Sequence, residues 1–206
     1  IRSYNPPIEP EENQIDRVIE ALKNSKRPVI YAGGGTIASN ASDELREFNS
    51  YIKAPVTNTL MGLGVYPGTD KYFLGMLGMH GTYQANMAMH NADLILAIGA
   101  RFDDRITNTP EKFAPRAQIV HFDVDHSSVS KIIEADIAVF GQVKDSLKSI
   151  NKKLKSNSTY FNENNFSDWH DQIADWKNAH GLNHELYKNN DDKSPILPQA
   201  AVQPVS

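Results

Sequence analysis

The chain has 206 residues, of which 40% are hydrophobic and 22% charged, and its formal net charge is −4. This balance is typical of a globular protein; the mixed charge argues against a nucleic-acid-binding protein, and no apolar run approaches the roughly 20 residues of a membrane span. Cysteine is absent, which excludes disulfides, thiolate metal sites and cysteine nucleophiles and is compatible with a cytoplasmic protein.

The chain opens with a connector and a helix. It starts at Ile1 without an initiator Met or a signal peptide, and Pro6 and Pro7 make residues 1–10 a stiff connector. We therefore expect an excised part of a longer protein, preceded by a missing amino-terminal domain. Residues 11–24 carry apolar side chains at helical spacing, which predicts an amphipathic helix. These side chains are Ile15, Val18, Ile19 and Leu22.

A glycine turn joins the first predicted strand to the next helix. Residues 29–32 are typical of a short buried strand, and Gly33, Gly34 and Gly35 follow directly. We expect Ser39 to cap the helix that comes next. Residues 55–59 then form a second strand, so the segment predicts a right-handed βαβ unit.

A long glycine-rich connection, residues 60–81, comes next, and such a length inside a compact domain is usually functional. Thr82 is expected to cap a helix that ends near Asn91. Residues 94–98 are an unbroken apolar run closed by Gly99. Such a run suits a strand that is covered on both faces, as in a parallel sheet.

The second half of the chain repeats the alternation of strands and helices. Residues 118–123 and 137–140 are predicted strands, residues 129–133 mark a short helix, and residues 143–154 a longer one. We therefore predict an α/β fold over residues 11–155: a doubly wound, Rossmann-like parallel sheet of at least five strands with helices on both faces.

The carboxy-terminal part, residues 156–206, is predicted to lead to a missing domain. Residues 156–165 are a polar linker, and residues 181–206 are rich in Asn, Pro and Gln, which indicates a flexible tail. Between them lies a helix with an aromatic face, which needs a partner surface in this chain or in a missing domain. That face comprises Phe166, Trp169, Ile173 and Trp176.

The glycine triplet is the first candidate binding element. Residues 33–38 fit the pattern G-x-G-x-x-A between a strand and a helix, where glycines let the backbone approach a diphosphate. The alternative is a plain tight turn. An orthodox NAD site also needs an acid at the end of the second strand, but residues 57–59 are Thr-Asn-Thr. That site is therefore disfavoured, and a nucleotide bound in another way remains open.

Charged residues follow the buried strand 94–98, namely Arg101, Asp103, Asp104 and Arg105. Open α/β sheets bind ligands at the carboxyl ends of their strands, and the arginine fork suits phosphate or carboxylate. These residues therefore indicate a ligand site, the alternative being a self-neutralising surface cluster.

Two further elements add to this prediction. Residues 77–81 suit a cofactor loop, because two glycines admit close backbone approach, although packing of the methionines is an alternative. Asp123 ends a strand, where it is placed to accept from a ribose hydroxyl; a capping role for Asp125 or Ser127 is the rival interpretation. His80 has no second ligand at metal spacing, so we expect no metal site.

Four pieces of sequence carry a resemblance to a known family: residues 29–35, 59–64, 74–83 and 99–105. In this order they resemble the central domain of the catalytic large subunit of acetohydroxyacid synthase, also called acetolactate synthase, a thiamine-diphosphate-dependent enzyme. The resemblance extends to about residue 180 and is greatest to the bacterial biosynthetic type.

The resemblance implies a parent enzyme that condenses pyruvate with a second 2-ketoacid to acetolactate or acetohydroxybutyrate in branched-chain amino-acid biosynthesis. It implies a cytoplasmic homo-oligomer with a regulatory small subunit, and thiamine diphosphate, Mg2+ and FAD as cofactors. FAD would lie on the central domain, without a redox role in the main reaction. The residues implied to line it are Gly33, Gly34, Gly35, Thr59, Leu60, Met61, Met79, His80, Gly99, Ala100, Arg101, Asp103, Asp123 and Val124. Arg105 is implied to hold the carboxylate of the second ketoacid.

The chain departs from the family pattern at two positions. Gln142 stands where the family usually has Asp, and His126 where it usually has Pro, both at the adenine end of FAD. The domains that activate thiamine diphosphate and bind its diphosphate and Mg2+ are missing, so we predict that this chain alone is inactive. Alternatives are the central domain of another thiamine-diphosphate carboligase, such as glyoxylate carboligase, a scaffold domain that binds no ligand, and an NAD-dependent deacylase, which the lack of cysteine disfavours.

Overall fold

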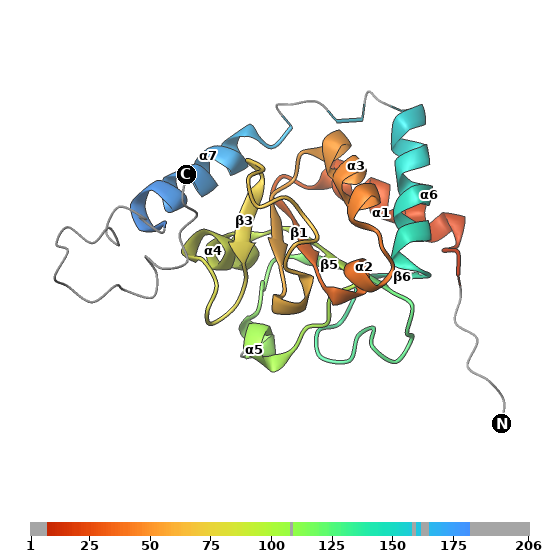
Figure 1. Ribbon diagram of the computed structural model, residues 1–206, viewed down its shortest axis with the longest axis horizontal. Coiled ribbons are helices and arrows are strands. Elements are labelled where there is room, and N and C mark those ends of the chain that lie inside the picture. Colours follow the sequence, from red (N-terminus) through yellow and green to blue (C-terminus); the bar gives the residue numbers. More distant parts are fainter. Residues whose placement is uncertain (1–7, 108, 158–159, 162–164, 182–206) are drawn as a thin grey trace, which may run out of the picture.

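The computed structural model describes residues 8–107, 109–157, 160–161 and 165–181, without the side chains of Asp104 and Arg105 (Figure 1). The described residues form one six-stranded sheet in the order β3-β2-β1-β4-β5-β6, and every neighbouring pair is parallel. The predicted α/β fold is confirmed. The strands are β1 (Pro28–Ala32), β2 (Val56–Asn58), β3 (Phe73–Met76), β4 (Leu94–Ile98), β5 (Gln118–Asp123) and β6 (Ile137–Phe140).

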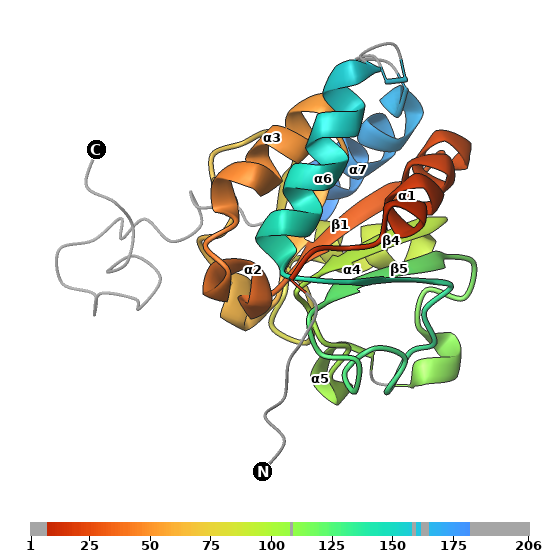
Figure 2. The ribbon, with the colours of Figure 1, turned by 90° about the vertical axis from the view of Figure 1, so that its right-hand side faces the viewer.

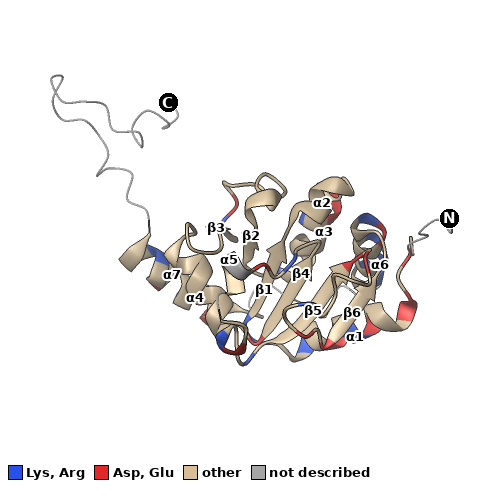
Figure 3. Cartoon of the chain, turned by 90° about the horizontal axis from the view of Figure 1, so that it is seen from below, with Lys and Arg blue, Asp and Glu red and all other residues tan. Residues whose placement is uncertain are grey.

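Helices cover both faces of the sheet, as the doubly wound prediction requires (Figure 3). On one face α3 (Ser42–Ile52) packs against α6 (Val143–Ser156), and on the other α4 (Tyr83–Asn91) packs against α7 (Ser167–His180). The other helical segments in the described part of the chain are α1 (Glu12–Asn24), beside β6, α2 (Gly34–Ala38), α5 (Asp104–Thr107) and the 3-10 helices Leu60–Gly62 and Pro110–Lys112.

The two central strands are apolar along their whole length because they are covered on both faces. All residues of β1 and β4 are buried, and the strands pair in register from Pro28 with Leu94 to Ala32 with Ile98. The segments that follow β1 and β4 therefore emerge side by side at one edge of the sheet. In Figure 2, α5 and the loop between β5 and β6 lie together at this edge.

The long connection over residues 60–81 contains a strand that the sequence pattern did not indicate. β3 is only four residues long and includes Gly75, whose φ of 92° is left-handed; neither feature is typical of a strand. It forms because Val56 N donates to Tyr72 O and Thr57 Oγ1 donates to Gly75 O, both at 2.8 Å. Pairing with β2 thus overrides a weak local propensity.

The prediction that Ser39 caps the next helix is wrong. Ser39 ends α2 instead, since its hydroxyl and its N–H both donate to Gly35 O. Asn40 then adopts a left-handed conformation with φ 50°, which separates the two helices. As a result α3 begins at Ser42.

The short helix predicted around Val129, Ile132 and Ile133 is also wrong, because this segment consists of turns. Ser130 is left-handed, with φ 57°, which a right-handed helix does not accommodate. Its Oγ accepts a hydrogen bond from Ala135 N at 3.0 Å, so the chain reverses here and leaves Ile132 exposed.

The aromatic helix α7 finds its partner surface within this chain. Trp169 and Ile173 are buried, and Trp169 Nε1 donates to Pro28 O at 3.1 Å. Trp176 packs edge-on against Trp169, with 5.7 Å between the ring centroids. The tail predicted beyond Gly181 lies outside the described residues. No helix in the described part of the chain combines the length and apolar character needed to cross a membrane.

Candidate functional site

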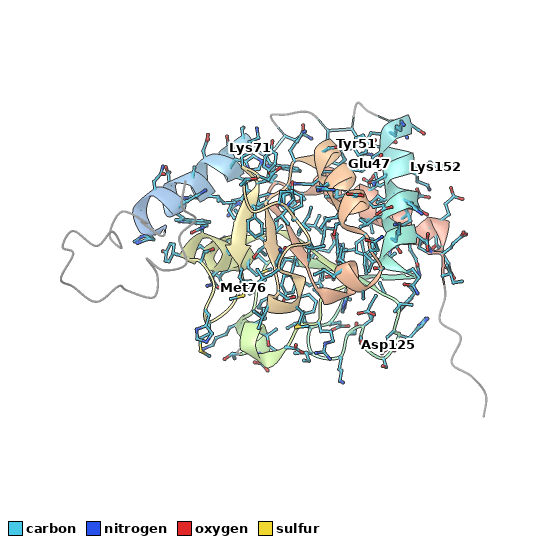
Figure 4. All side chains as sticks on the ribbon, viewed as in Figure 1. Glu47, Tyr51, Lys71, Met76, Asp125 and Lys152 are labelled. Carbon is cyan, nitrogen blue, oxygen red and sulfur yellow. The ribbon has the colours of Figure 1, made fainter. Side chains whose placement is uncertain are left out.

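A cavity of about 700 Å³ lies at the carboxyl ends of β1, β2, β4 and β5, the edge at which open α/β sheets bind ligands. We name it the carboxyl-end cleft. In Figure 4, Met76 and Asp125 lie toward this edge, whereas Tyr51, Lys71 and Lys152 lie toward the opposite one. The cleft is lined by Tyr31, Gly34, Gly35, Thr59, Leu60, Met61, Met76, Leu77, Gly78, Met79, His80, Gly99, Ala100, Arg101, Asp103, Ile106, Asp123 and Ser128.

A close backbone contact between the segments after β1 and β4 forms the floor of the cleft. Gly33 N donates to Ile98 O at 3.0 Å, and Gly35 N donates to Gly99 O at 2.9 Å. A Cβ at Gly33 would lie 2.3 Å from Gly99 O, and Gly99 itself is left-handed, with φ 57°. Glycine is therefore required here by the fold, whatever the cleft binds.

Gly34 has a different environment, because it faces the cleft and not the β4 turn. A Cβ at Gly34 would come 3.1 Å from the Met61 Cβ and would narrow the space between α2 and the segment after β2. The absence of a side chain at this position keeps the wall open for a ligand to approach the backbone closely.

One wall of the cleft exposes large apolar side chains. Leu60, Met61 and Met79 are 67%, 74% and 77% exposed, and all three line the cavity. Contiguous apolar exposure of this kind marks a ligand or protein contact in a folded chain. Flexible, polarisable methionines are suited to a flat aromatic group.

The opposite wall is charged. Arg101 and Asp103 form an ion pair at 3.4 Å, but their side chains are 71% and 52% exposed, so this pair contributes little to stability and leaves the guanidinium free to bind an anion. Phe102 holds the turn in place: its buried ring packs 5.8 Å from the Tyr31 ring and 5.4 Å from the His121 ring, centroid to centroid.

Asp123 ends β5 at the inner end of the cleft. Its Oδ1 accepts from Asp125 N at 2.9 Å, while Oδ2 lies 3.9 Å from the Nε2 of His121, a histidine that is only 1% exposed. Burial lowers the pKa of His121, opposed by the negative charge of Asp123 and a backbone contact at Ala100. No group of three His, Asp or Glu side chains among the described residues is placed to hold a metal ion.

Most residues predicted to line FAD meet at this cleft. Among those fourteen positions, only Gly33 and Val124 are not among its lining residues; Gly33 lies behind the wall, against Gly99. Arg105 lies in α5 beside the cleft residue Ile106. The side chains of Arg105 and Asp104 lie outside the described part of the structure.

Sequence reasoning missed Tyr31, Met76, Ile106 and Ser128 as lining residues. Tyr31 belongs to a strand that the apolar pattern assigned wholly to the core, and burial raises the pKa of its hydroxyl. Ser128 follows Asp125 and Ser127, which form a turn: Ser127 N donates to Asp125 Oδ1 at 2.9 Å. The rival interpretation, a helix cap at Asp125 or Ser127, is wrong because residues 126–133 form turns and bends and no helix follows before β6. The sequence signal that could have indicated Ser128 is an Asp at the end of a strand, Asp123, followed by a serine-rich segment.

The two residues that depart from the family pattern, His126 and Gln142, are not among the lining residues of the cleft. The His126 ring stacks on the Phe140 ring, with centroids 3.8 Å apart and an interplanar angle of 11°. Gln142 precedes α6, and its backbone N–H donates to Ile8 O at 2.9 Å. Both residues thus have local structural partners beside β6.

Comparison with known proteins gives a consistent picture. Residues 15–150 match the family described as thiamine pyrophosphate enzyme, central domain. The chain is 46% identical over 205 residues to the acetolactate synthase large subunit of Buchnera aphidicola subsp. Schlechtendalia chinensis, which covers 100% of this chain and 35% of that protein. It is 40% identical over 203 residues to acetolactate synthase isozyme 3 large subunit of Escherichia coli (strain K12), covering 98% of this chain and 34% of that protein.

A plant relative is similar to this chain to a comparable degree. Acetolactate synthase 1, chloroplastic, of Nicotiana tabacum is 40% identical over 197 residues, which cover 96% of this chain and 28% of that protein. The chain therefore spans about a third of the length of these relatives.

Proposed function

This chain belongs to the thiamine pyrophosphate enzyme central-domain family, and from that premise we propose that it is the FAD-binding central domain of an acetolactate synthase large subunit. One observation carries the proposal. The four segments that resemble this family, residues 29–35, 59–64, 74–83 and 99–105, all contribute lining residues to the carboxyl-end cleft. Segments so far apart in sequence share one cleft because they follow neighbouring parallel strands.

The parent enzyme, in this proposal, condenses pyruvate with a second 2-ketoacid to acetolactate or acetohydroxybutyrate. The acetolactate synthase relatives, which are about three times as long as this chain, support that assignment. Thiamine diphosphate and Mg2+ would be held by domains on either side of this one, in a homo-oligomer with a regulatory small subunit. This chain alone would then make no acetolactate, and detecting acetolactate from pyruvate and the purified chain would contradict the assignment.

The residues of the cleft fit FAD in size and chemistry. Its volume of about 700 Å³ falls within the range of roughly 300–1,000 Å³ that is usual for ligand pockets. The exposed wall of Leu60, Met61 and Met79 suits the flavin ring, and the Arg101 guanidinium suits the diphosphate. Asp123 supplies a carboxylate oxygen for a ribose hydroxyl.

When bound, FAD would supply a structural element that orders the cleft walls, and it would take no part in redox chemistry in the main reaction. The contribution of this chain is then to bind and orient. Arg105, which precedes the cleft residue Ile106 in the sequence, would hold the carboxylate of the second ketoacid. Its planar fork is matched to a carboxylate, which a lysine would grip less specifically.

The proposal is tested by titrating the purified chain with FAD and following flavin fluorescence and thermal stability. A ligand that binds only the folded state raises apparent stability by mass action. We expect saturable binding that Arg101→Ala weakens by about tenfold or more, since charge-assisted hydrogen bonds contribute roughly 1.5–3 kcal/mol. The matched control is Lys152→Ala, at the opposite edge of the sheet (Figure 4), which should bind normally. Absence of saturable binding, or equal weakening in both variants, would contradict an FAD site on this chain.

A further inference from the structure

His121 is a buried polar side chain in the core of the sheet. It lies within β5, 1% exposed, and neither ring nitrogen makes a hydrogen bond of good geometry with any described residue. Burying an unpaired polar group costs free energy that an apolar side chain of similar size would not cost. Packing alone therefore does not account for an imidazole at this position.

The carboxylate of Asp123 is the charged group that lies beside the His121 ring. Residues 121 and 123 project from the same face of β5, because side chains alternate along a strand. Their closest polar atoms, Nε2 and Oδ2, are 3.9 Å apart, which is longer than a hydrogen bond and shorter than a water-separated pair. Asp123 is a lining residue of the cleft, whereas His121 lies beneath it.

The imidazole of His121 also packs against the ring of Phe102. The Phe102 ring meets it edge to face, at an interplanar angle of 83°, and Phe102 is itself held between Tyr31 and Phe113. The same Phe102 lies between Arg101 and Asp103, so one aromatic contact links the histidine to the charged wall of the cleft.

The carboxylate of Asp123 has a different neighbour at each oxygen. Asp125 N donates to Oδ1 at 2.9 Å, and His121 faces Oδ2. We propose that His121 is a positioning residue that aims the Asp123 carboxylate into the cleft, where that carboxylate accepts hydrogen bonds from the vicinal hydroxyls of a ligand ribose. The part concerning the ligand rests on the proposed function; the coupling of His121 to Asp123 does not.

This inference fits the charge state of the histidine. Burial lowers the pKa of His121. Two contacts oppose this effect: the negative charge of the Asp123 side chain and a contact with the backbone of Ala100. The lowered pKa favours the uncharged ring, which faces the carboxylate without forming an ion pair with it. A protonated ring would instead form an ion pair and compete with a ligand hydroxyl.

The first test needs no ligand. The histidine side chains are labelled with 15N, and the titration of His121 is followed by NMR in the chain without FAD and in its Asp123→Asn variant. Removing the negative charge should lower the pKa of His121 further, since Asp123 raises it. His170, a partly buried histidine on α7 whose pKa burial also lowers, is the internal control and should titrate unchanged. An unaltered His121 titration in the variant would overturn the proposal.

The second test asks whether His121 acts through Asp123. His121→Phe should keep the fold and weaken FAD binding about tenfold, whereas His121→Gln, which retains a donor, should largely restore it. In the Asp123→Asn background, His121→Phe should have little further effect, because a double-mutant cycle detects coupling as non-additivity. The matched control is His170→Phe, which should bind FAD normally. Additive effects of the two substitutions would contradict the positioning role.

The two tests separate the inference from the proposed function. Failure of the wild-type chain to bind FAD, together with a His121 titration that responds to Asp123→Asn, would contradict the proposed FAD site and leave the His121–Asp123 pairing supported. FAD binding together with a His121 titration that does not respond to Asp123→Asn would support the proposed FAD site and contradict the His121–Asp123 pairing.

Discussion

The two ends of the parallel strands differ in how their polar groups are satisfied. At the amino ends, the Asp93 carboxylate before β4 accepts from Ser25 Oγ, Lys26 N and Arg27 N. Asp136, before β6, accepts from Ile119 N at 2.7 Å. These acids join neighbouring strand starts: the Asp93 carboxylate accepts three hydrogen bonds within the fold and the Asp136 carboxylate accepts one.

The carboxyl ends show the opposite pattern. The amide of Asn58, the hydroxyl of Thr59 and the imidazole of His121 are buried atoms without a hydrogen-bond partner among the described residues, while Met61 and Met79 are exposed. Buried polar groups in proteins are normally paired, and large apolar side chains are normally covered. Of the ten such unpaired polar atoms among the described residues, five belong to these three side chains, and the others lie on Glu44, Gln84, Ser146, Asn151 and His170. Unpaired polar atoms and exposed methionines that gather at one end of the sheet are typical of a functional site. The comparison predicts that substitutions at the amino ends affect mainly stability, whereas substitutions at the carboxyl ends affect mainly binding.

The largest expected effect on stability and binding comes from a substitution in the floor of the cleft. At Gly99, a Cβ would lie 2.6 Å from Thr36 N, and the backbone is left-handed. Gly99→Ala should therefore lower the free energy of unfolding by about 3 kcal/mol or more and abolish FAD binding. Urea denaturation measures the loss. The control is Gly68→Ala, since a Cβ there meets nothing within 4 Å and φ is not left-handed. Equal stability of the two variants would contradict the packing described for the floor.

Removing the acid at the amino ends should affect stability alone. Asp93→Ala leaves three donors, at Ser25, Lys26 and Arg27, without their acceptor. At about 1 kcal/mol for each lost hydrogen bond, we expect a loss of roughly 2–3 kcal/mol in the free energy of unfolding. The FAD affinity of the folded fraction should not change. A marked loss of affinity in this variant would mean that the two ends are not independent.

The acid at the carboxyl ends should behave in the reverse way. Asp123→Ala removes one acceptor for Asp125 N, so the free energy of unfolding should change by only about 1 kcal/mol. FAD affinity should fall about tenfold, because the ligand loses a charge-assisted hydrogen bond. Calorimetric titration beside urea denaturation measures both quantities. The comparison fails if Asp123→Ala proves as destabilising as Asp93→Ala.

The smallest expected effect concerns pH. Burial lowers the pKa values of His121 and His170 in the folded chain, so below the ordinary histidine pKa of about 6.5 the unfolded chain binds protons that the folded chain does not. Stability should therefore be fully present above that value and decline as the pH falls below it. His170→Phe should flatten this decline when unfolding is measured between neutral and mildly acidic pH. An unchanged slope would show that His170 does not contribute.

The sequence predicted the regular parts of the fold well because their physical signals are local. The apolar run before Gly99 gave the central strand β4 with its observed bounds, and Thr82 caps α4 as expected, accepting from Ala85 N at 3.3 Å. The missed strand β3 and the wrong cap at Ser39 depend on tertiary pairing and on left-handed backbone at Gly75 and Asn40. Neither determinant leaves a periodic pattern in the sequence.

The candidate site was predicted mainly through resemblance to a family and only partly from chemistry. Residue types and position indicated Arg101, Asp103 and Asp123, because these charged residues follow or end buried strands at their carboxyl ends, where open α/β sheets bind ligands. The role of His121 could not be found that way: a histidine inside a strand is indistinguishable from a core residue until the position of Asp123 is known.

The most direct measurement of the central claim is hydrogen–deuterium exchange of the chain with and without FAD. Binding at the carboxyl ends should slow exchange in residues 33–36, 59–61 and 99–101, which contribute backbone to the cleft, and leave residues 25–28 and 117–119 at the amino ends unchanged. Protection that appears first at the amino ends, or that is absent from all three cleft segments at saturating FAD, would contradict the account.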